Sequence, residues 1–282
     1  MLKVEFPTPG SCRPAEAQSM SRTARVLALA NQKGGVAKTT TTLNLGVALK
    51  DMGYRVLAVD LDPQSNLSMS QGIDVEELAV TMYDVLVREL PMANLIQARE
   101  IDVAPAGIEL AGAELALSAT IGRERALQRA LRPLLDQYDV ILIDTPPSLG
   151  LLTINAMVAS HGVIVPVQCE YLSLRGLAQL QATLEQVREH LNSEIAIIGI
   201  LPTMYDGRTL HGREAVDVLI QSFGDVVYPV RIGKTIRLAE APVSGHSVLS
   251  YDPHGQAARW YRQLAQIVVE RELSSVPQEV RA

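Results

Sequence analysis

The sequence has few aromatic residues and no long hydrophobic run. Aromatic residues make up 4% of the 282 positions, whereas 48% of the residues are hydrophobic. A core built from this composition must be mostly aliphatic, which is typical of a buried parallel sheet. No run reaches the ~18 apolar residues of a membrane-spanning helix, so the sequence predicts no membrane span.

Cysteine and positive charge are also scarce. Cys12 and Cys169 lie far apart and form no CxxC pair, which argues against a disulfide framework or a thiolate metal site. This usage fits a reducing cytoplasm. The formal net charge is −6, whereas a protein that coats nucleic acid by bulk attraction is usually basic. Any contact with an anionic partner must therefore use a local patch.

The two ends of the chain read as tails around one domain. Residues 1–22 contain Pro7, Pro9, Gly10 and Pro14 and lack the apolar segment of a secretory signal, so we predict a flexible tail there. No internal repeat or low-complexity linker interrupts the rest. We expect one domain over residues 23–272 and a polar tail over residues 273–282.

Within this domain, short apolar runs alternate with helical patterns. This alternation predicts an α/β fold: a single doubly wound, mostly parallel sheet with helices on both faces. The predicted strands cover residues 25–31, 55–62, 138–147, 162–170, 195–203 and 225–230. The predicted helices cover residues 39–52, 123–137, 174–191, 212–222 and 253–271.

Polar side chains follow three of the predicted strands. The stretch 33–40 follows the first strand, Asp60 and Asp62 end the second, and Asp144 ends the third. Ligands of open parallel sheets bind beyond the carboxyl ends of the strands. We therefore expect these side chains to converge at one edge of the sheet.

The stretch QKGGVAKTT, residues 32–40, has the composition of a phosphate-binding loop. Gly34 and Gly35 allow the backbone amides to approach an anion, and the following helix offers the positive end of its dipole. Lys38 is placed to reach the outer phosphates and Thr39 to bind Mg²⁺. Ala37 stands where glycine is usual. We expect a negative φ there, as is ordinary at the start of a helix, so that the methyl group costs little.

The lysine before the glycine pair changes the interpretation of this loop. With Lys33 and Lys38 together, the stretch resembles the deviant Walker A motif, KGGxxK[ST], of the ParA/MinD family of ATPases. VDLDPQSN at 59–66 is similar to the second motif of that family, with Ser65 in place of its glycine. Further similarity to the Soj-type ParA group covers LIDTPPSLGLLTINAM at 142–157, VPVQCEYLSLRGL at 165–177, LPTMYDGRT at 201–209 and IRLAEAP at 236–242.

The resemblance implies ATP and Mg²⁺ as ligands and a weak, Mg²⁺-dependent ATPase activity. Asp62 matches the catalytic aspartate that orients the attacking water, and Lys33 matches a lysine that reaches the ATP of the other subunit in a nucleotide-sandwich dimer. Thr39, Asp60 and Asp144 would form the metal site. The ATP contacts implied are Lys33, Gly34, Gly35, Val36, Ala37, Lys38, Thr39 and Thr40 at the phosphates and Thr203, Met204, Gly233 and Thr235 near the nucleoside.

The resemblance also implies non-specific binding to double-stranded DNA and release by a ParB-type centromere-binding protein. It places DNA contacts at Arg208 and Arg237, which Lys234 and Arg231 would extend. Residues 201–240 hold five Lys or Arg and five Asp or Glu, so a basic face there requires clustering in three dimensions. The implied location is the cytoplasm, on the nucleoid. Ordinary surface arginines with no ligand are the alternative.

Three other functions remain as alternatives. A membrane-cycling ATPase like MinD would need a terminal amphipathic anchor. Here the last predicted helix has an apolar stripe that we expect to pack on the core, and the sequence after it is polar. An iron-protein type of reductase would need cluster cysteines. A scaffold that binds nucleotide without turnover would not need Asp62 and Thr39, which are both present.

Overall fold

The computed structural model describes residues 23–169 and 173–274. The predicted tail at 1–22, with Cys12, lies outside the described residues, as do residues 275–282 of the predicted C-terminal tail. Leu273, the first residue of the predicted C-terminal tail, is fully buried in the core. The packed part of the chain therefore extends into the segment that we predicted to be a tail.

Within the described residues, seven strands form one sheet in the order β3-β4-β2-β5-β1-β6-β7. All neighbours pair in parallel except β3 and β4. The strands are β1 (Arg25–Leu29), β2 (Val56–Asp60), β3 (Gln97–Ala98), β4 (Asp102–Ala104), β5 (Val140–Asp144), β6 (Gly162–Gln168) and β7 (Ile197–Thr203). The predicted α/β fold is confirmed.

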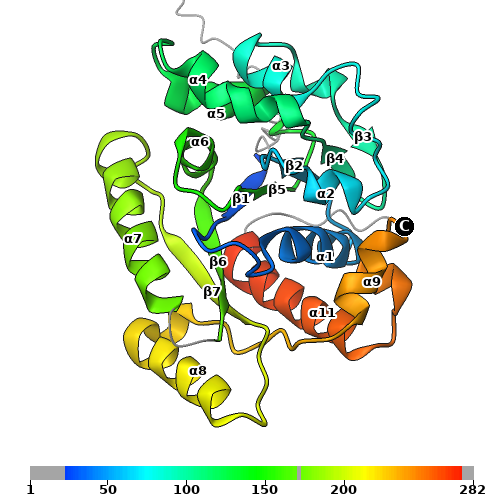
Figure 1. The fold of residues 1–282 in the computed structure, drawn as a ribbon, viewed down its shortest axis with the longest axis vertical. Coiled ribbons are helices and arrows are strands. Elements are labelled where there is room, and N and C mark those ends of the chain that lie inside the picture. The colour runs from blue at the N-terminus through cyan, green and yellow to red at the C-terminus, as the bar shows by residue number, and fades with distance from the viewer. Residues whose placement is uncertain (1–22, 170–172, 275–282) are drawn as a thin grey trace, which may run out of the picture.

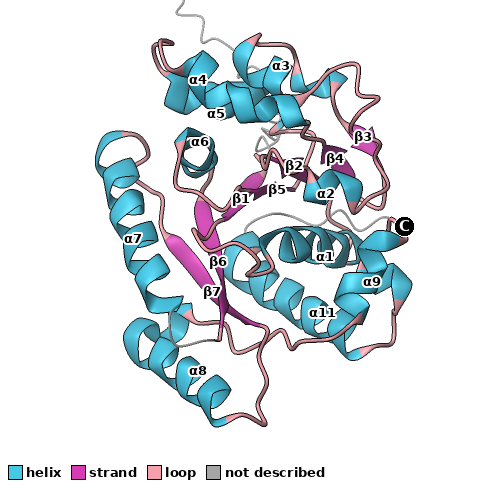
Figure 2. Ribbon diagram, in the orientation of Figure 1, coloured by secondary structure: helices cyan, strands magenta, loops and turns pink. Residues whose placement is uncertain are grey.

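Helices cover both faces of this sheet, as Figures 1 and 2 show. The α-helices are α1 (Lys38–Asp51), α2 (Asn66–Met69), α3 (Met82–Val87), α4 (Ala113–Leu117), α5 (Ala126–Leu131), α6 (Leu151–Ala159), α7 (Ser173–His190), α8 (Leu210–Phe223), α9 (Arg237–Val243), α10 (Val248–Tyr251) and α11 (Gln256–Val268). Short 3-10 turns join several of them, and a π-helical turn at Val269–Leu273 follows α11.

The alternation of side chains along β1 divides the core into two layers. Leu27 and Leu29 pack with α1 and α11, whereas Val26 and Ala28 pack with α3 to α6. This is the two-residue period of a strand that is buried on both faces. A third cluster joins β6 and β7 to α6, α7 and α8. The apolar stripe of α11 is buried against α1, as predicted.

The sixth predicted strand, at residues 225–230, is wrong. A 3-10 turn occupies Gly224–Val226, and the segment after it makes only an isolated bridge between Val227 and Ile200. Pro229 has no amide hydrogen for a longer ladder. The short strands β3 and β4 were not predicted, because two or three residues are too few to show the alternation of apolar and polar residues that indicates a strand.

The helix predicted over residues 123–137 is shorter and interrupted. A 3-10 turn at Arg123–Arg125 precedes α5, and another at Arg132–Leu134 follows it. Pro133 lies in the second turn, where it cannot continue an α-helical hydrogen-bond ladder. Among residues 23–169 and 173–274, every helix is too short or too polar to cross a bilayer.

Tyr228 gives a test of this packing, because its buried hydroxyl finds no hydrogen-bond partner among the described residues. A buried hydroxyl without a partner is destabilising. We expect Tyr228→Phe to raise the free energy of unfolding by about 1 kcal/mol. The matched control is Tyr138→Phe, since Tyr138 donates to Asp102 Oδ2 at 2.9 Å. That change should lower the free energy of unfolding by about 1 kcal/mol in the same urea titration. Destabilisation by both changes would contradict the prediction.

Candidate functional site

The loop between β1 and α1 is held from below by buried polar side chains. Asn31 donates from Nδ2 to the Pro166 carbonyl at 2.7 Å and accepts from the Lys33 amide at 3.0 Å. Thr203, at the end of β7, donates from Oγ1 to the Val36 carbonyl at 3.1 Å. These bonds connect the loop to β6 and β7, so its shape is set by the sheet beneath it.

Ala37 has φ 70° and ψ 35°, which is left-handed backbone. The expected negative φ is therefore wrong. Gly35 has φ 71°, and Ser65, the other residue that replaces a family glycine, has φ 55°. At both positions the backbone has a left-handed conformation, which glycine adopts freely. The Cβ atoms of Ala37 and Ser65 make this conformation strained.

A pocket of about 600 Å³ opens above this loop. Its residues come from the loop and the start of α1, from the segment after β2, from Pro147 after β5, from Met204 after β7 and from the chain around α9. They are Gly34, Gly35, Ala37, Lys38, Thr39, Thr40, Asp62, Gln64, Asn66, Ser70, Pro147, Met204, Ile232, Gly233, Lys234, Thr235, Leu238 and Ala239. A Cβ added at Gly35 would meet no atom within 4 Å, so the loop leaves open space on that side.

Two carboxylates lie at the carboxyl ends of neighbouring strands, as predicted. Asp60 of β2 is in register with Asp144 of β5, and both are fully buried. Asp144 Oδ2 accepts from Thr39 Oγ1 at 2.6 Å. Burial, followed by the charge of Asp60, raises the pKa of Asp144 well above its usual range. The site thus holds two anionic groups in a place that penalises their charge.

Asp60 is tied to the segment that follows it. Its Oδ2 accepts from the Ser68 amide at 3.0 Å and from Ser68 Oγ at 2.7 Å, and its Oδ1 accepts from the Asp62 amide at 3.1 Å. Burial raises its pKa to about 6, although these hydrogen bonds oppose the shift. Asp60 therefore fixes the position of Asp62. Its role in a metal shell stays a prediction.

The donor set fits Mg²⁺ held by few protein ligands. Among the described residues, no group of three or more His, Cys, Asp or Glu side chains could enclose a metal ion. Mg²⁺ usually takes one or two protein oxygens and completes its shell with water and phosphate oxygens. Thr39 and Asp144, already paired at the base of the pocket, supply oxygens of that kind.

Lys38 is a cation that interacts electrostatically with Asp144 and Asp62. It is buried, and burial lowers the pKa of its ammonium, while Asp144 and Asp62 oppose that shift. Asp62 borders the pocket and accepts from the Gln64 amide at 3.0 Å through Oδ1. Lys38, Thr39 and Asp62 line the pocket, and Asp144 lies buried behind this lining, where it accepts the hydrogen bond from Thr39.

Lys33 contacts its own subunit in this structure. Its Nζ donates to Gln168 Oε1, at the end of β6, at 2.8 Å. Neither Lys33 nor Val36 lines the pocket, and Val36 is buried. A contact from Lys33 to a second subunit, which the resemblance implies, would require its ammonium to leave Gln168.

The predicted nucleoside contacts separate into two groups. Met204, Gly233 and Thr235 line the pocket together with Lys234. Thr203 is buried beneath the loop and bonds to Val36 instead. Met204 has a positive φ of 50°, and Tyr205 next to it bridges to Gly233. These two segments form one wall of the pocket.

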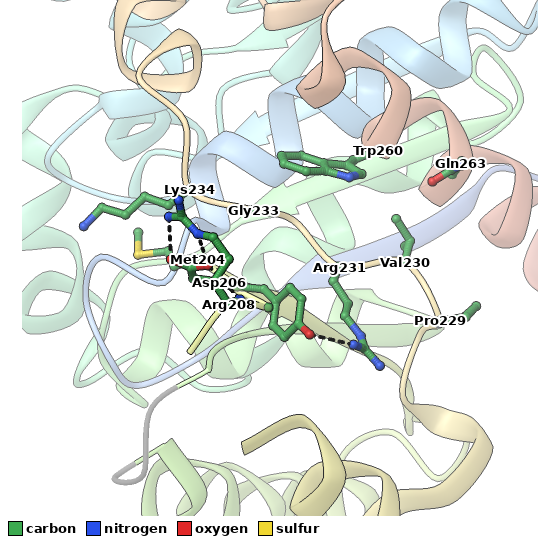
Figure 3. Close-up of a pocket in the computed structure, with 12 residues that line it drawn as sticks. Met204, Asp206, Arg208, Pro229, Val230, Arg231, Gly233, Lys234, Trp260 and Gln263 are labelled. Atoms are coloured by element: carbon green, nitrogen blue, oxygen red, sulfur yellow. Dashed lines mark hydrogen bonds and ion pairs between the residues drawn. The ribbon is translucent and has the colours of Figure 1, made fainter. Parts of the chain in front are cut away.

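Three of the four predicted DNA contacts lie around a second pocket, of about 700 Å³, shown in Figure 3. Arg208, Arg231 and Lys234 line it, and we call it the basic pocket. Arg208 is highly exposed and forms a two-point ion pair with Asp206 at 2.8 and 2.9 Å. The fourth residue, Arg237 on α9, lies outside this lining and pairs with Glu240 at 3.0 Å.

Sequence reasoning missed several residues of the site. Ser68 holds Asp60 and also accepts from the Ala106 amide at 3.1 Å, and Asn31 organises the loop. Gln64, Asn66 and Ser70 line the pocket. A lone serine or asparagine carries no pattern in a single sequence, so only the motif at 59–66 could have drawn attention to part of this group.

Comparisons with known proteins place the chain among nucleotide-binding proteins. Residues 24–197 match a family model described as an AAA domain. The chain is 47% identical over 247 residues to the sporulation initiation inhibitor protein Soj of Bacillus subtilis, which covers 86% of this chain and 98% of Soj. It is 44% identical over 253 residues to the chromosome partitioning protein ParA of Caulobacter vibrioides, covering 88% and 95%.

Two solved structures are similar over most of their length. Cobyrinic acid a,c-diamide synthase from Mycobacterium smegmatis, with bound ADP and magnesium, is 40% identical with a TM-score of 0.79, covering 90% of this chain and 97% of that one. The cell division ATPase MinD of Pyrococcus furiosus is 29% identical with a TM-score of 0.71, covering 88% and 99%.

The left-handed residues give a stability test of the loop. Ala37→Gly and Ser65→Gly should each raise the free energy of unfolding by about 0.5–1 kcal/mol, because glycine removes the Cβ clash. Ala182→Gly is the control. Ala182 is an exposed residue within α7, where glycine should lower the free energy of unfolding by about 1 kcal/mol. Urea unfolding without nucleotide measures all three. A decrease at Ala37 like that at Ala182 would contradict left-handed backbone at Ala37.

Proposed function

Because this chain belongs to the AAA-domain family that includes Soj and ParA, we propose that it is a DNA-partitioning ATPase. One observation carries the proposal. The pocket that holds Lys38, Thr39 and Asp62 and the basic pocket share a wall, to which Met204, Gly233 and Lys234 belong. Nucleotide and nucleic acid would thus occupy neighbouring cavities in one subunit.

The residues around the first pocket can bind and orient ATP. The amides of the loop and the start of α1 would donate to a bound phosphate, and Lys38 adds a positive charge. Thr39 and Asp144 would hold Mg²⁺, which neutralises charge on the phosphates when bound. A relative crystallised with ADP and magnesium, and the same relative with an ATP analogue and magnesium, support these two ligands.

Hydrolysis requires little more than positioning of the water and stabilisation of charge. Asp62 borders the pocket, and its main chain is fixed by Asp60. It can therefore accept a proton or a hydrogen bond from a water beside the outer phosphate. We infer a slow, Mg²⁺-dependent turnover, because no other titratable side chain apart from Lys38 and Lys234 lines the pocket within the described residues.

The remaining partners follow from the family. In an ATP-bound dimer, Lys33 would leave Gln168 and reach the nucleotide of the other subunit. The dimer would present Arg208, Arg231, Lys234 and Arg237 to the phosphates of DNA without reading sequence. A ParB-type protein would stimulate hydrolysis and release the DNA. This cycle would place the protein on the nucleoid in the cytoplasm.

Two other names among the comparisons suggest different activities. The MinD-like alternative needs an amphipathic helix free to lie on lipid, whereas the apolar face of α11 packs on α1. The diamide synthase name belongs to a solved relative at 40% identity, below the 47% and 44% of Soj and ParA. The DNA-partitioning function is therefore favoured, and a liposome-binding experiment separates it from the MinD-like alternative.

The central experiment uses Asp62→Ala. We expect this variant to retain Mg-ATP binding and ATP-dependent binding to a random-sequence duplex, and to lose at least about 90% of turnover, since positioning of the water is lost. Lys38→Ala should lose ATP binding and, with it, DNA binding. Phosphate release and DNA anisotropy at two salt concentrations measure these effects.

Normal turnover by Asp62→Ala would overturn the catalytic assignment. Binding to anionic liposomes in place of DNA would favour the MinD-like alternative.

Asp206 should limit DNA affinity, because its carboxylate competes with DNA phosphate for Arg208. Its hydrogen bonds from Arg208 hold the pKa of Asp206 at about 2, so it is ionised at neutral pH. We expect Asp206→Asn to tighten ATP-dependent duplex binding about three-fold, the size of an exposed ion pair. The side-chain oxygen of asparagine can still accept a hydrogen bond from the Arg208 amide, so the backbone turn at residues 206–208 is kept.

Asp74→Asn is the matched control for this change. Asp74 is exposed and accepts from the Glu76 amide at 3.0 Å, as Asp206 does from the Arg208 amide, but no arginine pairs with it among the described residues. Its replacement removes the same formal charge and should leave duplex affinity nearly unchanged. Equal effects of the two substitutions would mean that net charge, and not the Arg208 pair, sets the affinity.

A further inference from the structure

The basic pocket contains an aromatic ring and a side-chain amide, Trp260 and Gln263, which contacts to phosphate do not require. We propose that it binds a nucleotide unit whose base is unpaired, as in single-stranded DNA, with the base stacked on Trp260 and the phosphate held by Arg231 and Lys234. This inference rests on the proposed DNA-binding function and adds to it a second mode of contact. The volume of the basic pocket is about 700 Å³, whereas that of the pocket above the loop between β1 and α1 is about 600 Å³.

The charges of the pocket favour an anion. Arg208 and Asp206 neutralise each other. Among the described residues, neither Arg231 nor Lys234 pairs with a carboxylate, so both charges remain available. Arg231 donates from Nη1 to the hydroxyl of Tyr205 at 3.0 Å, and its guanidinium lies 4.9 Å from the centre of that ring. This contact fixes the guanidinium in place without cancelling its charge.

The opposite part of the pocket is aromatic and carries an amide. Figure 3 shows Trp260 and Gln263 projecting from α11, whereas Arg231 and Lys234 come from the segment before α9. The indole packs tightly on Gly233, where an added Cβ would lie 2.4 Å from the Trp260 ring. The glycine therefore gives the ring its position. Gln263, three residues later on the same helix, offers both a donor and an acceptor to the edge of a base.

These features fit an unpaired base better than duplex DNA alone. Contacts to the backbone of a duplex need cations and amides, and they do not use an aromatic surface within a cavity. Proteins that bind single strands combine a positive groove with aromatic side chains on which bases stack. In a duplex both faces of each base are already stacked on neighbours, so Trp260 would find no partner there.

Trp260 is the only tryptophan of the chain, so its fluorescence reports this pocket without a label. The first experiment titrates the wild-type protein, without nucleotide and with a slowly hydrolysed ATP analogue, with four probes. They are a thymidine oligonucleotide of about 15 nucleotides, an abasic strand of equal length, a hairpin duplex and thymidine monophosphate. We expect the thymidine strand to quench Trp260 and to bind about ten-fold more tightly than the abasic strand, because only the first can stack.

The second experiment measures binding of a labelled thymidine strand to variants. Trp260→Leu should reduce affinity about ten-fold and abolish the preference over the abasic strand, whereas Trp260→Phe should keep part of that preference. Lys234→Gln should weaken both strands equally. The control is Lys50→Gln, which removes an exposed lysine at the far end of α1 and should change neither affinity. Thermal unfolding checks that each variant is folded.

The outcomes separate this inference from the proposed function. Duplex binding with no quenching by the thymidine strand, or an unchanged strand preference in Trp260→Leu, would overturn the inference and leave DNA partitioning intact. Failure of every nucleic acid to bind would overturn both. Quenching by thymidine monophosphate at the same concentration as the strand, with the slowly hydrolysed ATP analogue bound in the other pocket, would support the nucleotide site and identify a free nucleotide as its source.

Discussion

The structure depends on the burial of negative charge at one edge of a parallel sheet. Asp60 and Asp144 are in register at the ends of β2 and β5, and no water-exposed surface relieves their charge. Burial raises the pKa of both carboxyl groups, and the charge of Asp60 adds to the shift of Asp144. Lys38 and the hydroxyl of Thr39 offset part of this cost. A divalent cation would offset more, so this arrangement of carboxylates favours a cation such as Mg²⁺ beside them.

Strain in the backbone is concentrated around the same pocket. Ala37, Ser65 and Met204 all have positive φ, and they lie in the loop, after Asp62 and on the opposite wall. Such conformations persist only where surrounding contacts determine them. For Ala37 those contacts include the hydrogen bond from Thr203 to the preceding carbonyl. The sheet beneath therefore imposes a loop shape that the local residue types do not favour.

The strands, and the site at their ends, could largely be predicted, because each strand is a short apolar run that ends at polar residues. β1, β2 and β5 are apolar runs that end in polar residues, which placed Asp144 at the sheet edge, and the motif at residues 32–40 placed Lys38 there. The sign of φ at Ala37 could not be predicted, since local preference indicates one sign and distant contacts impose the other. Pro133 is the residue in the sequence that signals the interruption of the helix predicted over residues 123–137. Ser68 acts through one distant carboxylate, which no pattern in a single sequence reveals.

The shared wall between the two pockets gives a physical reason for nucleotide and nucleic acid to influence each other. Met204 and Gly233 border both cavities, and Gly233 also packs on Trp260. A nucleoside that displaced Met204 or Gly233 would therefore press on the indole directly, within one subunit. In the proposed cycle, dimerisation would gate DNA binding by bringing two faces together. The shared wall would add a route within a single subunit, so a nucleotide in the pocket above the loop should alter the environment of Trp260 even at concentrations too low for a dimer.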